Sequence, residues 1–176
     1  ISIISPTSEH TLSGRSLHLF KPDATTADSD LADVQAIQFD ARDYDLPNLS
    51  SDFFNLTPDT VWPKNSLQKF TAFGFPSKRQ LVDDDPPRVH SVKVILSGVY
   101  DVPSQSPHLH SIRIDKPDDY QPDGLSGGPV FYLGKDGNDY FIGLAGMITR
   151  AHPASDLMWF IEAGFLYQMA LSAKMN

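Results

Sequence analysis

The chain has no cysteine among its 176 residues. This absence excludes disulfide bonds, a thiol nucleophile and zinc sites that depend on cysteine ligands. It fits an intracellular protein and slightly favours the cytoplasm, although many exported bacterial proteins also lack cysteine. The fold must therefore be held by its hydrophobic core and its hydrogen bonds.

Long apolar runs and positive charge are also scarce. No stretch reaches the length of about 18 apolar residues that a membrane-spanning helix requires. The formal net charge is −8, with 14 Lys and Arg against 22 Asp and Glu. A non-specific nucleic-acid binder normally carries the opposite sign, and a polybasic membrane anchor needs a cluster of Lys or Arg. We therefore expect neither nucleic acid nor a membrane as a partner.

The residues that are abundant predict many short strands. Hydrophobic residues make up 40% of the chain, and 14 prolines and 11 glycines are scattered along it. Period-two alternation, bounded by turn residues, predicts strands at 16–20, 33–40, 69–76, 90–99, 109–115, 130–133, 140–150 and 157–162. Residues 163–174 have apolar side chains at helical spacing and predict a helix. The proline-rich stretch 41–66 predicts a link between two halves, and we expect 77–88 to be a charged loop and 101–108 a turn.

Residues 124–130 read Gly-Leu-Ser-Gly-Gly-Pro-Val and carry the clearest chemical signal. Glycines allow the backbone to turn so that its N–H groups converge beside the serine hydroxyl, which is the arrangement that stabilises an oxyanion. The stretch also matches the G-x-S-x-G pattern of α/β-hydrolases, but that elbow needs a helix directly after the serine. Gly-Gly-Pro followed by Val130 to Tyr132 favours a strand instead. The pattern therefore predicts a serine nucleophile loop outside the α/β-hydrolase fold.

The longer string G-x-S-G-G-P, leading into a strand, resembles the chymotrypsin-like (trypsin-like) serine protease superfamily. Three further stretches are similar to that family. Asp33 opens a strand like the one that carries the catalytic acid, residues 73–76 (Phe-Gly-Phe-Pro) resemble the turn that opens the second barrel, and residues 146–149 (Gly-Met-Ile-Thr) resemble the cleft strand. The resemblance covers about residues 14–174. It implies an all-β, two-barrel fold with a C-terminal helix, the first barrel and linker spanning 1–66 and the second barrel and helix 67–176.

The resemblance also implies a role for each candidate site residue. Ser126 would be the nucleophile that hydrolyses peptide bonds through an acyl-enzyme, and Asp33 would orient a histidine that acts as the base. The N–H groups of Gly124 and Ser126 would form the oxyanion hole. No metal and no cofactor are implied.

Substrate contacts follow from the same resemblance. Thr149, Arg150 and Ala151 would pair with an extended protein or peptide substrate as an added strand. Tyr120, six residues before Ser126, would lie at the base of the specificity pocket. Because no acid occupies that place, we expect no preference for Lys or Arg and a preference for a medium-sized apolar side chain. Additional domains or a regulatory partner protein are compatible with this family.

Leu125 distinguishes between the branches of this protease family. Digestive and clotting enzymes have an acid at this position, which pairs with the new N-terminus after zymogen cleavage. A leucine cannot pair with an ammonium group, so activation of that kind is excluded. The small bacterial and HtrA-like branches fit better.

The general base is the departure from the family pattern. The family's histidine precedes the acid within a T-A-x-H string, whereas only His10 and His18 precede Asp33 here and neither stands in such a string. Three hypotheses stay open. The histidine lies upstream of Ile1, or His10 serves, or the protein is a histidine-less pseudoprotease whose cleft binds a peptide as a binding or regulatory module.

Two other groups of residues are candidates for metal ligands, on weaker sequence patterns. His108 and His110 have the spacing of one strand face and could form a metal-binding pair, but a third ligand is missing from the pattern. The run Asp83 to Asp85 is interpreted as part of a solvated loop.

Overall fold

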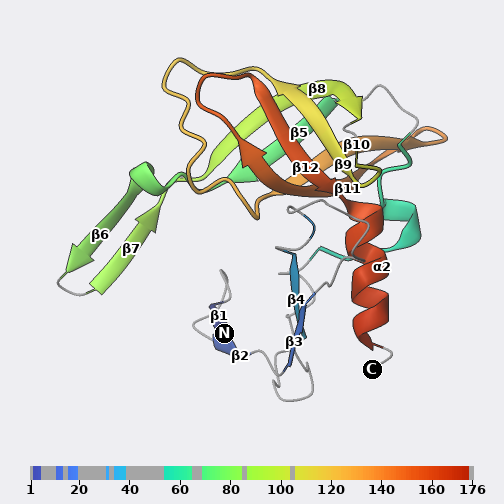
Figure 1. Ribbon diagram of the computed structural model, residues 1–176, viewed down its shortest axis with the longest axis horizontal. Coiled ribbons are helices and arrows are strands. Elements are labelled where there is room, and N and C mark those ends of the chain that lie inside the picture. The colour runs from blue at the N-terminus through green and yellow to red at the C-terminus, as the bar shows by residue number, and fades with distance from the viewer. Residues whose placement is uncertain are drawn as a thin grey trace. The chain divides into compact units, whose positions relative to one another are not determined.

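The computed structural model describes residues 2–4, 11–13, 16–19, 31, 34–38, 54–64, 69–84, 87–103 and 106–174. The chain forms two compact units, one comprising 1–57 with 167–176 and the other 58–166 (Figure 1). The division after Thr57 falls within the stretch that the sequence predicts to be a link.

The larger unit contains a closed antiparallel barrel, and its six strands follow the order β10-β11-β12-β9-β8-β5, with β5 paired to β10 (Figure 1). The strands are β5 (Lys69–Gly74), β8 (Val94–Pro103), β9 (Leu109–Ile114), β10 (Pro129–Asp136), β11 (Asp139–Ala151) and β12 (Leu157–Glu162). Each overlaps a strand that the apolar alternation predicts, which confirms an all-β barrel. Helix α2 (Ala163–Lys174) has the predicted bounds. In the described parts of the chain, no helix is both long enough and apolar enough to cross a bilayer.

The barrel is filled by side chains that alternate along its strands. The buried cluster contains the inward residues Phe70, Ala72, Leu96, Ile112, Ile114, Val130, Tyr132, Ala145, Ile148, Met158 and Phe160. Trp62, which precedes the first barrel strand, inserts among them with its ring centroid 5.3 Å from that of Phe70. The backbone N–H of Trp62 donates to the Leu144 carbonyl at 3.0 Å, so the link is attached to the barrel beside this core. Burying one large apolar side chain contributes roughly 1.5–3 kcal/mol, and this cluster is the main source of the barrel's stability.

The loop predicted at 77–88 is wrong. A short 3₁₀ turn, η4 (Ser77–Arg79), leads into an antiparallel hairpin of β6 (Gln80–Asp84) and β7 (Pro87–Ser91) (Figure 1). The backbone of Asp83 is in register with that of Arg88, so this charged stretch forms a hairpin and not a loop. The predicted strand 90–99 is interrupted at 92–93, and β8 continues to Pro103 through part of the turn predicted at 101–108.

The smaller unit contains two short antiparallel pairs in its described residues. β1 (Ser2–Ile4) pairs with β2 (Thr11–Ser13), and β3 (Ser16–Leu19) pairs with β4 (Gln35–Gln38). The strands predicted at 16–20 and 33–40 are therefore present in shortened form. Before the barrel, the larger unit begins with a 3₁₀ turn, η3 (Pro58–Thr60).

Candidate functional site

The serine loop, residues 124–129, forms the last part of the connection from β9 to β10 and depends on two glycines with left-handed backbone. Gly124 has φ +88° and Gly127 has φ +84°, a region that L-residues with side chains rarely adopt. A Cβ atom at Gly124 would also lie 2.8 Å from the Ser77 nitrogen, whereas one at Gly127 would meet nothing within 4 Å. Gly124 is therefore required by both conformation and space, and Gly127 by conformation alone.

Two backbone hydrogen bonds hold this loop against β11, and a third closes a turn within it. The N–H of Gly127 donates to the Ile148 carbonyl at 2.8 Å, and the N–H of Ile148 donates to the Gly128 carbonyl at 2.8 Å. The N–H of Gly128 closes a turn on the Leu125 carbonyl at 2.9 Å. The Leu125 side chain is 1% exposed and packs against Gly74 of β5. The residue before the serine therefore acts as an apolar anchor, and the loop is fixed from both sides.

Two backbone N–H groups of the loop are not used in hydrogen bonds within the described structure. Within the described ranges, the N–H groups of Gly124 and Ser126 have no protein acceptor, whereas those of Leu125, Gly127 and Gly128 each have one. These two are the donors that the family resemblance assigns to an oxyanion hole. They are available to a ligand.

Ser126 is exposed and lies against the strand predicted to bind substrate. Its hydroxyl donates to the Thr149 carbonyl at 3.2 Å. Thr149 occupies an irregularity in β11, where the pairing with β12 skips from Ile148 to Arg150. Arg150 lies over the ring of Trp159 at 5.6 Å, and Ala151 ends the strand. The structure therefore brings Ser126 next to Thr149, the first of the predicted substrate residues 149–151.

A groove of about 530 Å³ opens beside the serine. One wall is the loop itself and the other comes from β5, the residues after it and β10. The lining residues are Phe73, Gly74, Phe75, Lys93, Gly124, Ser126, Gly127, Gly128, Pro129 and Phe131. Apart from Ser126 and Lys93, the side chains that line the groove are apolar. The groove therefore suits an apolar ligand whose polar end lies near the serine.

Tyr120 does not line that groove. It lines a second cavity of about 410 Å³, together with residues that include Asp115, Pro117 and Asp119. Its side chain is 7% exposed, and its hydroxyl has no hydrogen-bond partner among the described atoms. Burial raises the pKa of Tyr120 to about 12. Residues 149–151 line neither of these two cavities, so Tyr120 and the predicted substrate strand are not brought into one described pocket.

Asp33, the predicted acid, and His10, a candidate base, lie outside the described residues. Leu31 and Val34, which flank Asp33 in the sequence, are buried. No histidine hydrogen-bonds to Ser126 among the residues that the structure describes. His152, which follows the substrate strand, accepts a bond from the Ala154 N–H at 3.1 Å through its Nδ1 atom.

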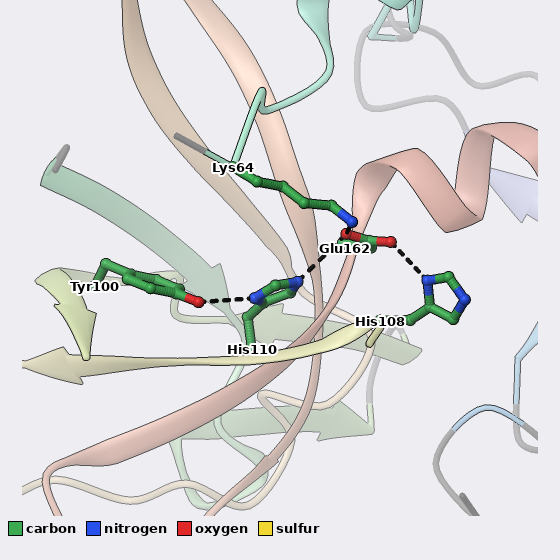
Figure 2. A network of polar contacts seen from close by, with 5 residues as sticks. All are labelled: Lys64, Tyr100, His108, His110 and Glu162. Atoms are coloured by element: carbon green, nitrogen blue, oxygen red, sulfur yellow. Dashed lines mark hydrogen bonds and ion pairs between the residues drawn. The ribbon is translucent and has the colours of Figure 1, made fainter. Parts of the chain in front are cut away.

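His108 and His110 belong to a different cluster, which we call the Glu162 network (Figure 2). Glu162 ends β12, is 3% exposed and forms an ion pair with Lys64. Because an ionised carboxylate only accepts hydrogen bonds, His108 donates from Nδ1 at 2.6 Å and His110 donates from Nε2 at 3.3 Å. The remaining Nδ1 of His110 then accepts from the Tyr100 hydroxyl at 3.0 Å. The members are therefore Lys64, Tyr100, His108, His110 and Glu162.

The electrostatics of Glu162 reflect this full pairing. Burial alone would raise its pKa, but the hydrogen bonds from His110, His108 and Lys64 outweigh burial and lower the pKa from an ordinary 4.5 to about 2. Burial, and the negative charge of Glu162 beside it, raise the pKa of Tyr100. Within the described residues no group of three His, Asp or Glu side chains could hold a metal ion. The histidine pair instead binds a carboxylate.

The sequence draws attention to His108 and His110 but misses Glu162 and Lys64. The available signal is Glu162 itself, a charged residue that directly follows the alternating strand 157–161 and precedes an apolar helix. A carboxylate in such a place is seldom buried unless it is paired.

Comparison of the chain with models of protein families, with curated proteins and with solved structures gives no match.

Proposed function

We propose that this chain is a chymotrypsin-like serine endopeptidase with Ser126 as its nucleophile. The described six-stranded barrel would be the second barrel of a two-barrel fold, and the first would be built by the N-terminal unit. One observation carries the proposal: the exposed Ser126 lies on a loop that is hydrogen-bonded to β11 and lines a groove of about 530 Å³, and two N–H donors of this loop have no acceptor among the described residues.

The reaction follows from these groups. The Oγ atom of Ser126 attacks the carbonyl carbon of the peptide bond, and its proton passes to a histidine that Asp33 orients. The N–H groups of Gly124 and Ser126 donate to the oxyanion that forms, and each such donor stabilises the transition state by roughly 3–4 kcal/mol. The C–N bond breaks, the histidine returns the proton to the leaving amine, and water then hydrolyses the acyl-enzyme and restores Ser126.

The substrate is an extended protein or peptide chain. Its backbone would pair with residues 149–151, which begin next to the serine at Thr149. The groove wall formed by Phe73 and Phe131 favours apolar substrate side chains, and no acidic residue lines this groove to select Lys or Arg. The base would be a histidine, and His10 is the candidate that precedes Asp33 and lies outside the described residues.

A second candidate function is a pseudoprotease that binds a peptide without cleaving it. The bond from the Ser126 hydroxyl to the Thr149 carbonyl favours this candidate, because a serine held by a backbone carbonyl is not activated by an imidazole. In that case the groove and the open N–H donors would hold a peptide carbonyl or carboxylate as a regulatory module.

Digestion of fluorescein-labelled casein by the full-length protein tests the proposal. We expect the wild-type protein to cleave it and Ser126→Ala to lose at least about a thousandfold in rate, because the nucleophile is removed. Ser97→Ala, at an exposed serine of β8, is the matched control and should retain the activity. Equal cleavage by Ser126→Ala would overturn the proposal, and binding without cleavage by the wild type would support the pseudoprotease.

A further inference from the structure

The outer side of the barrel carries a continuous apolar surface, which we call the apolar face: Phe73, Ile95, Phe131, Leu133 and Ile142. Leu133 of β10 and Ile142 of β11 are register partners, and both are more than half exposed. The rings of Phe131 and Phe73 pack edge to face at 5.6 Å, and Phe73 is the register partner of the exposed Ile95. The apolar face therefore crosses four neighbouring strands, β11, β10, β5 and β8.

This face is continuous with the groove at the serine. Phe73 and Phe131 belong to the apolar face and also line the groove beside Ser126. A chain bound in the groove could therefore extend across the barrel strands without leaving an apolar surface. Continuous exposed apolar patches on a soluble domain commonly mark interaction sites.

Three lysines border the apolar face, in a chain whose formal net charge is −8. The Lys93 ammonium lies 5.5 Å from the centre of the Phe73 ring, and that of Lys135 lies 5.7 Å from the ring of Tyr140. Lys69 precedes the outward positions of β5. Among the described residues these lysines pair with no carboxylate, whereas Lys64 pairs with Glu162 in the same unit. Within the described ranges, the face thus carries positive charge that is not paired with a carboxylate.

We propose that the apolar face and its bordering lysines, Lys69, Lys93 and Lys135, bind an acidic peptide segment that carries apolar side chains. The apolar side chains would cover the exposed Leu133 and Ile142, and the carboxylates would neutralise the lysines. The partner follows from charge: a symmetric dimer through this face would set the patch against itself and bring lysines toward lysines. The binding goes beyond the proposed peptidase reaction, because it needs no chemistry at Ser126.

Fluorescence anisotropy of a labelled synthetic peptide tests this site. The peptide has twelve residues and alternates glutamate with leucine or phenylalanine, and the protein carries Ser126→Ala so that it cannot be cleaved. We expect saturable binding that the double substitution Leu133→Ser with Ile142→Ser weakens about tenfold, because two central apolar contacts are lost. Lys93→Gln with Lys135→Gln should weaken binding at low salt by about three- to tenfold and reduce its dependence on salt.

Matched controls separate the face from general effects. Leu171→Ser changes an exposed leucine of α2, and Lys116→Gln changes an exposed lysine that donates to the Pro153 carbonyl. Both should bind the peptide as the parent does. Thermal melting of each variant shows whether the fold is kept, and the substituted side chains point outward from the barrel, so we expect similar melting curves.

Three results would overturn the inference. One is equal affinity for a peptide with lysine in place of glutamate, and another is unchanged affinity after the double substitution at Leu133 and Ile142. The third is a dimer in light scattering that this double substitution converts to a monomer, since the face would then bind a second copy. Because the Ser126→Ala protein is used throughout, failure of the peptidase proposal changes none of these readings.

Discussion

The serine loop and the Glu162 network lie in the same unit and treat their polar groups in opposite ways. The loop leaves the N–H groups of Gly124 and Ser126 without an acceptor in the described structure and exposes the serine hydroxyl. The network buries Glu162 and gives both of its oxygens partners. Open donors on a rigid loop are suited to a ligand, whereas a fully paired carboxylate is suited to holding strands together.

The Glu162 network and the serine loop also differ in the parts of the chain that they hold together. Glu162 lies where β12 ends and α2 begins. It pairs with Lys64 of the link and with His108 and His110 at β9, and so connects the link to that strand (Figure 2). Its own N–H donates to the His108 carbonyl at 2.9 Å, which adds a backbone bond at the same junction. The serine loop is held separately, by the packing of Leu125 and by the backbone hydrogen bonds to β11. The position of its N–H groups therefore does not depend on the Glu162 network.

The largest expected effect is at Gly124. Gly124→Ala would add a left-handed alanine and a Cβ 2.8 Å from the Ser77 nitrogen, so the backbone must shift and carry its N–H away from the oxyanion position. We expect a loss of about a thousandfold in kcat/KM for peptide hydrolysis, or about 4 kcal/mol. Gly127→Ala is the matched control, with the same backbone strain but open space around the Cβ. It should lose about tenfold or less, and equal losses in the two variants would contradict the geometric account.

The next effect concerns the stability of the network. Glu162→Gln removes the charge that Lys64 and the two histidines share, and leaves the ammonium without its partner. We expect the free energy of unfolding to fall by about 3 kcal/mol, measured by urea denaturation at pH 7. Asp156→Asn, at the exposed pair with Arg113, is the control and should move the midpoint only slightly. A small change at Glu162 would show that the buried pairing contributes little.

The same carboxylate predicts how stability depends on pH. Its folded pKa of about 2 lies below the ordinary 4.5, so its contribution is complete above pH 4.5 and is lost as the pH falls toward 2. Melting temperatures from pH 6 to pH 2 should therefore fall less steeply below pH 4.5 in Glu162→Gln than in the wild type. Parallel curves for the two proteins would mean that Glu162 is not the group responsible.

The smallest effect is expected at Tyr120. Its buried hydroxyl has no partner in the described structure, so Tyr120→Phe removes an unsatisfied polar group. We expect unfolding free energy to be unchanged or to rise by about 1 kcal/mol. The same variant tests whether Tyr120 contributes to substrate specificity. If Tyr120 contacts the substrate, Tyr120→Phe should change which apolar side chain is preferred when cleavage of a series of peptides is measured. A loss of stability would reveal a hydrogen bond to the hydroxyl.

Much of the barrel could be predicted from period-two alternation, because inward residues such as Phe70 and Ala72 on β5 or Ile112 and Ile114 on β9 follow it closely. Helix α2 could be predicted because its apolar spacing changes at Ala163. The hairpin β6–β7 could not, since the backbone register of Asp83 with Arg88 joins two strands, whereas composition alone suggests solvated charge.

The candidate site was predictable in part. Glycine chemistry identifies the loop around Ser126, and the family resemblance predicts that Thr149 belongs to the cleft strand. The 3.2 Å bond from the Ser126 hydroxyl to the Thr149 carbonyl places the two residues side by side. The Glu162 network depends on contacts between residues far apart in the chain, Lys64 with Glu162 and His108 with Glu162, which no local pattern contains. For the same reason the separate cavity of Tyr120 could not be foreseen from its distance to the serine along the chain.

The most direct test of the central claim is labelling of the full-length protein with a fluorophosphonate, followed by peptide mapping of the adduct. A nucleophilic serine forms a covalent phosphonyl ester and releases fluoride, whereas an ordinary serine hydroxyl does not react at a comparable rate. The proposal predicts a single adduct on Ser126 that is absent from Ser126→Ala and kept in Ser97→Ala. Intact protein that takes up no label, or Ser126→Ala that is labelled equally, would contradict the assignment of Ser126 as a nucleophile.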